Sequence, residues 1–140
     1  MAKFICKVVS APIFADKAVK FVSDESCGAV IIFLGTVRNE NEGRRVKGVN
    51  YSAFKEMAEA AFNKICKKAI SKWRVRKIAI IHRVGKLKLG DISVIIAVSS
   101  PHRGEAYQAS RFAIEELKRV SPIWKEELYA NKSRRWIAND

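Results

Sequence analysis

The chain has 140 residues, 49% hydrophobic and 29% charged, which is the composition of one ordinary globular domain covering residues 1–140. Its three cysteines, Cys6, Cys27 and Cys66, are an odd number without a Cys-x-x-Cys pair, which argues against a disulfide framework and a four-ligand zinc site. No apolar run approaches the ~20 residues of a membrane span, and Lys7 interrupts the N-terminal one. We therefore expect a cytoplasmic protein.

The net charge of +13 makes an anionic partner or substrate the first functional hypothesis. Ten of the 27 basic residues, but only one of the 14 acidic ones, lie between residues 64 and 91. This basic stretch is typical of a solvated, lysine-rich face. A docking surface for an acidic protein or a nucleic acid is the alternative.

The first half of the chain alternates short strands with one helix. Residues 3–9 form an apolar run that predicts a strand, and a helix is expected from about residue 13 to 22. The β-branched run at residues 29–37 predicts a buried strand. Residues 38–47 are polar and centred on Gly43, so we expect a mobile loop that carries three arginines. Alternation at residues 49–53 predicts a half-buried strand.

A long amphipathic helix follows. Apolar residues recur every three or four positions from Phe54 to Trp73, which is the pattern of one buried helical face. Cys66 lies on that face, so we expect a buried structural thiol rather than a nucleophile. Residues 75–84 and 92–99 predict two strands, joined by the turn sequence KLKLGD.

The last elements complete an α+β pattern. Ser100 and Pro101 predict a helix start, because serine can cap the free amides and proline suits the first helical position. This helix should run to about Val120, and residues 123–130 alternate like a strand. His82, at the end of its strand, is expected to be a satisfied structural imidazole. The element order predicts an α+β fold with three helices and a mixed, largely antiparallel sheet.

Three polar clusters suggest where chemistry occurs. Arg38 directly follows a buried strand, where an arginine can bind phosphate or carboxylate bidentately. His102 and Arg103 fall in the first turn of a helix, whose amides and dipole favour an anion. Lys118 and Lys125 flank a chain reversal that could bring both ammonium groups to one pocket, suited to proton transfer or nucleophilic attack. Solvated surface side chains remain the alternative for each cluster.

The same clusters, in the same order, carry a family resemblance. The chain closely resembles the large, catalytic subunit of molybdopterin synthase over essentially residues 28–137. The resemblance rests on five segments: GAVIIFLGTVRNENEGR (28–44), AIIHRVGKLKLGD (79–91), VSSPHRGEAYQA (98–109), ELKRVSPIWKEE (116–127) and RW (135–136). Several spaced motifs in one order are far more specific than any single one.

This resemblance implies an α/β hammerhead fold and a sulfurtransferase of molybdenum-cofactor biosynthesis. Such enzymes convert cyclic pyranopterin monophosphate into molybdopterin. The sulfur arrives as a thiocarboxylate at the C-terminus of a small ubiquitin-like subunit. The implied assembly is a homodimer of large subunits within a heterotetramer, and the resemblance implies neither a cofactor nor a metal.

The resemblance also implies specific site residues. Lys118 and Lys125 align with the family's catalytic lysines, and Arg135 matches a further arginine. The predicted substrate-binding residues are Thr36, Val37, Arg38, His102, Arg103, Lys118, Lys125, Glu126 and Glu127.

Two readings from other functional classes stay open from the residues alone. A small RNA- or DNA-binding domain would explain the net charge, but the chain has no aromatic-rich RNP-type strand and no GXXG loop. A non-catalytic relative that only binds partners is the other alternative, although Arg38 and both lysines are present.

Overall fold

The computed structural model describes residues 2–138 and confirms an α+β fold with three helices and mixed, largely antiparallel sheets. The elements follow in the order β1 (Lys3–Val9), α1 (Ala15–Val22), β2 (Ala29–Thr36), β3 (Glu40–Asn41), β4 (Arg44–Ala53), α2 (Lys55–Lys72), β5 (Lys77–Arg83), β6 (Gly85–Lys88), β7 (Ile92–Ser100), α3 (Arg103–Val120), β8 (Ile123–Tyr129) and β9 (Arg134–Ala138).

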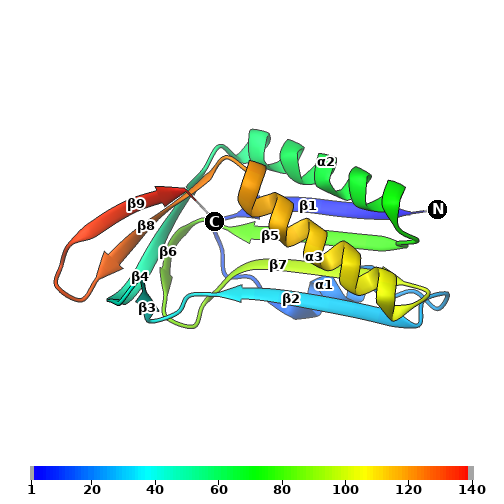
Figure 1. The fold of residues 1–140 in the computed structure, drawn as a ribbon, viewed down its shortest axis with the longest axis horizontal. Helices are drawn as coiled ribbons and strands as arrows, with labels where there is room; N and C mark the ends of the chain where they lie inside the picture. Colours follow the sequence, from blue (N-terminus) through cyan, green and yellow to red (C-terminus); the bar gives the residue numbers. More distant parts are fainter. Residues whose placement is uncertain (1, 139–140) are drawn as a thin grey trace.

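A four-stranded sheet forms the larger layer, with strand order β1-β5-β7-β2. β1 and β5 pair in parallel, and the other two pairs are antiparallel. Helices α2 and α3 cover one face and α1 the other (Figure 1). Ile78 and Ile80 belong to the core under α2 and α3, whereas Ala79 between them packs toward α1. Both faces are buried, which explains why these strands are continuously apolar.

The apolar face predicted for helix α2 is buried over most of its length but not at its start. Cys66 is fully buried on the predicted face, as expected, together with Ala58, Phe62, Ile65 and Ala69. Phe54 and Met57, at the predicted start of the same face, remain 61% and 62% exposed because the sheet does not extend beneath them. Within the described residues, no helix is both long and apolar enough to cross a membrane.

A second sheet contains β3, β4, β8 and β9 in that order, and β6 pairs with β4. It stands at one end of the molecule, beyond the last turn of α3 (Figure 1). Three of its strands, β3, β6 and β9, were not predicted. Residues 85–88 were expected within a connection, but Leu87 is 1% exposed and anchors this segment against β4 as strand β6. β9 pairs with β8 and has no clear alternation in the sequence.

The expectation of a mobile loop at residues 38–47 is wrong. The segment folds into a hairpin in which Asn41 pairs with Arg44. Its turn residues, Glu42 and Gly43, have φ values of 50° and 76°, the left-handed conformation that tight two-residue hairpins require. The hairpin extends β4 and becomes one wall of the cavity described below.

The predicted start of α3 is also wrong, by two residues. Ser100 belongs to β7, and its hydroxyl donates a hydrogen bond of 2.7 Å to the carbonyl of Arg74 instead of capping a helix. The N-cap residue is His102 and the helix begins at Arg103, so Pro101 lies in the connection. Ser100 pairs with Ala29 of β2, so strand pairing continues through this serine and outweighs the local capping preference.

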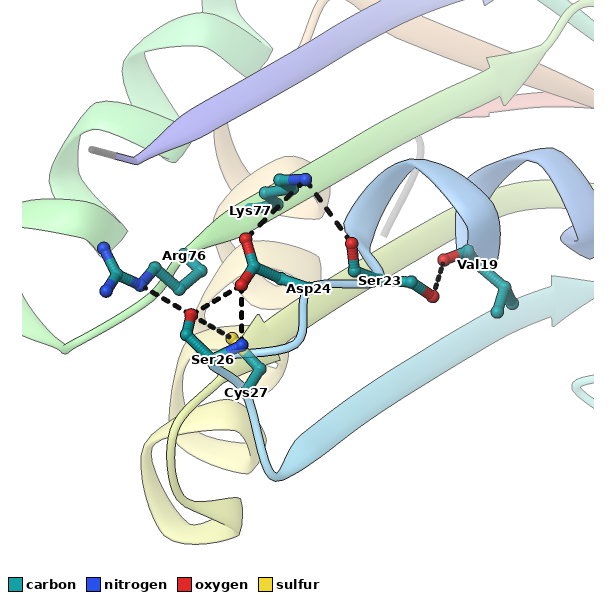
Figure 2. A network of polar contacts seen from close by, with 7 residues as sticks. All are labelled: Val19, Ser23, Asp24, Ser26, Cys27, Arg76 and Lys77. Atoms are coloured by element: carbon teal, nitrogen blue, oxygen red, sulfur yellow. Dashed lines mark hydrogen bonds and ion pairs between the residues drawn. The ribbon is translucent and has the colours of Figure 1, made fainter.

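The connection between α1 and β2 is tied to β5 by a polar network (Figure 2). The Asp24 carboxylate accepts hydrogen bonds from the backbone N–H and the hydroxyl of Ser26, which lower the pKa of Asp24. Lys77 approaches the same carboxylate at 3.8 Å, and Arg76 Nε donates to the Ser26 hydroxyl at 3.2 Å. These contacts fix the end of the larger sheet that is remote from the cavity.

Candidate active site

A cavity of about 420 Å³ lies where the two sheets meet the last turn of α3. Arg38 reaches it from the end of β2, Lys118 from α3 and Lys125 from β8. Thr36, Val37 and Glu127 also line it, as does Arg135 of β9. The structure therefore brings together most of the residues that the sequence singled out. Apolar side chains complete the walls: Phe33, Val46, Val49, Val94, Ile114, Leu117 and Ile137.

Glu127 is the most buried charged group of the cavity, at 3% exposure. Asn41 donates to both of its carboxylate oxygens from Nδ2 at 2.9 Å, and the Tyr129 hydroxyl donates to Oε1 at 2.8 Å. Burial raises the pKa of Tyr129, and its bond to Glu127 raises that pKa further. The phenol therefore stays a donor, and the buried carboxylate has the hydrogen bonds that its burial requires.

The cavity carries more positive than negative charge. Arg38, Lys118, Lys125 and Arg135 face it, against Glu42 and Glu127. Arg135 is paired with Glu42 at 2.9 Å on the rim, and Lys125 Nζ lies 4.0 Å from Glu127 Oε2. An anion that enters this space meets cations on three of its walls, which favours phosphate or carboxylate groups.

Three predicted binding residues do not line this cavity. His102 and Arg103 lie at the opposite end of α3, about 22 Å from Lys118 at the helical rise per residue. Glu126 precedes Glu127 on β8 and points to the other face of the sheet, because successive strand residues alternate. Their assignment to substrate binding remains a prediction from the family resemblance.

Sequence reasoning missed several residues that build the cavity. Asn41 was placed in a loop without a role, and Tyr129 was not considered. Tyr51 lines the cavity and makes an edge-to-face contact with His82, at 5.0 Å between ring centroids. The available signal was weak: a single amide in a polar segment predicts no contact to a carboxylate 86 residues away.

His82 is buried, but the expectation of a satisfied imidazole is correct for only one of its two ring nitrogens. Nδ1 lies 2.8 Å from the carbonyl of Arg83 and must donate, since a carbonyl oxygen only accepts. Nε2 is buried and has no hydrogen-bond partner within residues 2–138. Burial lowers the imidazole pKa from 6.5 to about 4, and the charge of Lys118 adds to the effect. The imidazole is therefore neutral at physiological pH.

The lowered pKa of His82 predicts an acid-sensitive fold. Between pH 6.5 and 4 the unfolded chain binds a proton that the folded chain excludes, so the free energy of unfolding falls as the pH falls. From pH 7 to 5 this loss should be about 2 kcal/mol. Urea denaturation of wild type and of His82→Phe, which keeps a ring against Tyr51, would measure it. An equal loss in both proteins would contradict the prediction.

Comparisons with known proteins place this arrangement in a family. The family model described as MoaE protein matches residues 8–120. The chain belongs to the MoaE family. It is 42% identical to the molybdopterin synthase catalytic subunit of Bos taurus over 138 residues, which are 99% of this chain and 73% of the bovine protein. Membership confirms that the chain is an enzyme of molybdenum cofactor biosynthesis, as the motifs predicted. It weighs against the alternative hypothesis of an RNA- or DNA-binding domain.

Solved structures agree with this family and its fold. The crystal structure of molybdopterin synthase from Staphylococcus aureus superimposes with a TM-score of 0.88 at 38% identity, over 94% of this chain and 95% of that one. A complex of subunits 1 and 2 of the molybdopterin-converting factor from Helicobacter pylori matches with a TM-score of 0.75 at 24% identity, over 94% and 88% of the two chains. The second likeness supports the fold.

Proposed function

We propose that the cavity is the place where this enzyme converts cyclic pyranopterin monophosphate into molybdopterin, with sulfur from a thiocarboxylate at the C-terminus of a small ubiquitin-like subunit. The convergence of Arg38, Lys118 and Lys125 on one cavity of about 420 Å³ carries the proposal. That space has apolar walls for a ring or a peptide tail, and cations for the charged ends. We place the enzyme in the cytoplasm.

The cations have separate tasks in this proposal. The planar guanidinium of Arg38 holds the phosphate of the precursor, because its paired N–H groups match two phosphate oxygens. Lys118, on the last turn of α3, holds the negative charge of the incoming thiocarboxylate. Fixing both reactants in one cavity turns an encounter between two molecules into a reaction within one complex.

Lys125 is the proposed proton donor. Attack of the thiocarboxylate sulfur on the side-chain carbons of the precursor breaks carbon–oxygen bonds, one of them to the cyclic phosphate, and the leaving oxygens take up protons. Water then hydrolyses the acyl–sulfur bond to each carrier, which departs with an ordinary carboxylate. The Lys125 side chain is 17% exposed, and its Nζ lies 4.0 Å from the Glu127 carboxylate, which holds the amine in the cavity. Glu127 itself is held by Asn41 and Tyr129, so it orients the lysine without moving.

Two further parts of the proposal concern assembly. The relatives are named catalytic subunits, which supports a small partner subunit that delivers the sulfur. His102 and Arg103 are too far from Lys118 on the same helix to share its cavity. In the proposed homodimer they bind substrate only if they reach the cavity of a second copy. The basic stretch at residues 64–91 would favour an acidic partner surface.

Reconstitution tests the proposed function. The purified chain, a small ubiquitin-like subunit with a C-terminal thiocarboxylate and the cyclic precursor should yield a product that has gained two sulfur atoms, measured by mass spectrometry. The matched control is the same small subunit with an ordinary carboxylate, which should yield none. Subunits that form a complex but transfer no sulfur to the precursor would refute the proposal.

A further inference from the structure

Asn41 stands between two oppositely charged residues of the cavity. Its Oδ1 accepts a hydrogen bond of 3.1 Å from Nη2 of Arg38. Its Nδ2 donates to both oxygens of Glu127, each at 2.9 Å. One neutral amide thus uses its acceptor on the cation and its donor on the anion, and it separates the two charges.

Direct pairing would be the simpler arrangement for these two charges. Arginine and a carboxylate form bidentate ion pairs, which are among the strongest hydrogen-bonded contacts in proteins. Such a pair would use two donors of Arg38 and neutralise its charge. With Asn41 in place, the Arg38 side chain donates one hydrogen bond within residues 2–138, and Glu127 is satisfied without Arg38. The guanidinium keeps its charge and most of its five donors for another anion.

The backbone holds Asn41 firmly in this position. It pairs with Arg44 across the hairpin turn, whose residues Glu42 and Gly43 have positive φ. The hairpin is closed a second time by a hydrogen bond of 2.8 Å from the Val46 N–H to the Asn39 carbonyl. An amide on such a short, doubly closed hairpin has little freedom to leave its two charged partners.

We propose that Asn41 is a positioning residue for sulfur transfer: it keeps Arg38 from pairing with Glu127, so that the guanidinium faces the phosphate of the precursor and Glu127 stays beneath Lys125. This inference rests on the proposed function of the cavity. It adds a residue that acts through the two charged residues on either side of it.

Asn41→Ala should expose this role in the kinetics. Without the amide, Arg38 is free to pair with Glu127, and KM for the precursor should rise about tenfold or more, the usual effect of losing hydrogen bonds to charged groups, while kcat changes less. The matched control is Asn39→Ala, an exposed asparagine of the same hairpin whose backbone carbonyl is retained. A KM within twofold of wild type, or an equal rise in Asn39→Ala, would overturn the proposal.

Asn41→Asp gives a second measurement, the pH dependence of activity. Replacing a residue with a purely structural role would not change this dependence. The new carboxyl group faces Glu127 and Arg38, with Lys125, Tyr129 and the Arg135–Glu42 pair nearby. When protonated it reproduces the amide, since its O–H can donate to Glu127 and its carbonyl can accept from Arg38. When ionised it repels Glu127 and neutralises Arg38. Activity relative to wild type should therefore rise from pH 8 to pH 6, and a flat ratio would count against the proposal.

A crystal structure of Asn41→Ala separates this inference from the proposed function, because it needs no activity. We expect the Arg38 guanidinium within about 4 Å of the Glu127 carboxylate, the distance of an ion pair. If Arg38 stays apart from Glu127 in the variant, the spacer role is wrong even when wild type makes product. If wild type makes no product but the pair forms, the spacer is real and the assigned reaction is wrong.

Discussion

Replacing Lys125 with alanine should lower the rate of molybdopterin formation at least about a hundredfold, the usual contribution of a positioned proton donor. Lys118→Ala should have an effect of similar size, because the thiocarboxylate would lose the cation that holds it near the precursor. Both lysines line the same cavity as Arg38. The rate constants would be measured by single-turnover sulfur transfer in the reconstituted complex.

Lys125→Ala should still fold, so that a lower rate can be attributed to the loss of the amine. Glu127 keeps its hydrogen bonds to Asn41 and Tyr129, so no buried carboxylate is left without a partner. Lys86→Ala is the matched control, because it removes an exposed lysine from the same sheet. Near-wild-type rates for Lys125→Ala would refute the proposed role of Lys125 as proton donor.

Lys125→Arg distinguishes proton transfer from simple charge. A guanidinium keeps the positive charge but does not release its proton at neutral pH. If Lys125 is the donor, the arginine variant should stay nearly as slow as alanine. Recovery of most of the activity would assign the lysine an electrostatic role instead.

Phe62→Ala should reduce the free energy of unfolding by about 3–5 kcal/mol, the largest stability effect that we expect from one substitution. The ring is fully buried where α2 packs on the four-stranded sheet and α3. The loss combines the transfer of apolar surface to water with a cavity that the surrounding helix and strands cannot fill. Urea denaturation at pH 7 would measure it.

The control for Phe62 lies on the same helix. Met57 is 62% exposed, so Met57→Ala should change the free energy of unfolding by no more than about 0.5 kcal/mol. Equal losses in the two variants would mean that α2 does not pack as described. A loss below about 1 kcal/mol for Phe62→Ala would mean the same.

Most of the fold was predictable because its signals are local. The periodic apolar face of α2 and the β-branched run of β2 each lie within one element, and both predicted the right structure. The errors occurred where pairing with a distant strand decided the outcome. Leu87 makes residues 85–88 a strand only because β4 lies beside it, and Ser100 extends β7 only because Ala29 of β2 pairs with it.

The candidate site was predictable in part, and for a different reason. Arg38, Lys118 and Lys125 stand at strand and helix ends, and their spacing within family motifs identified them before any geometry was known. Asn41 carried no such signal, because its role depends on a hydrogen bond to Glu127, 86 residues further along the chain. His82 was predicted to be a satisfied imidazole, but its Nε2 has no partner among residues 2–138, which depends on the groups that the fold places around it.

The sequence by itself determined the class of the fold, the three helices and the family, because periodicity and ordered motifs are properties of the chain alone. Only the tertiary structure decided that a predicted loop is a hairpin, that His102 and Arg103 lie far from Lys118, and that Asn41 separates Arg38 from Glu127. These depend on contacts between remote segments, where strand register and packing choose one arrangement among many that local preferences allow.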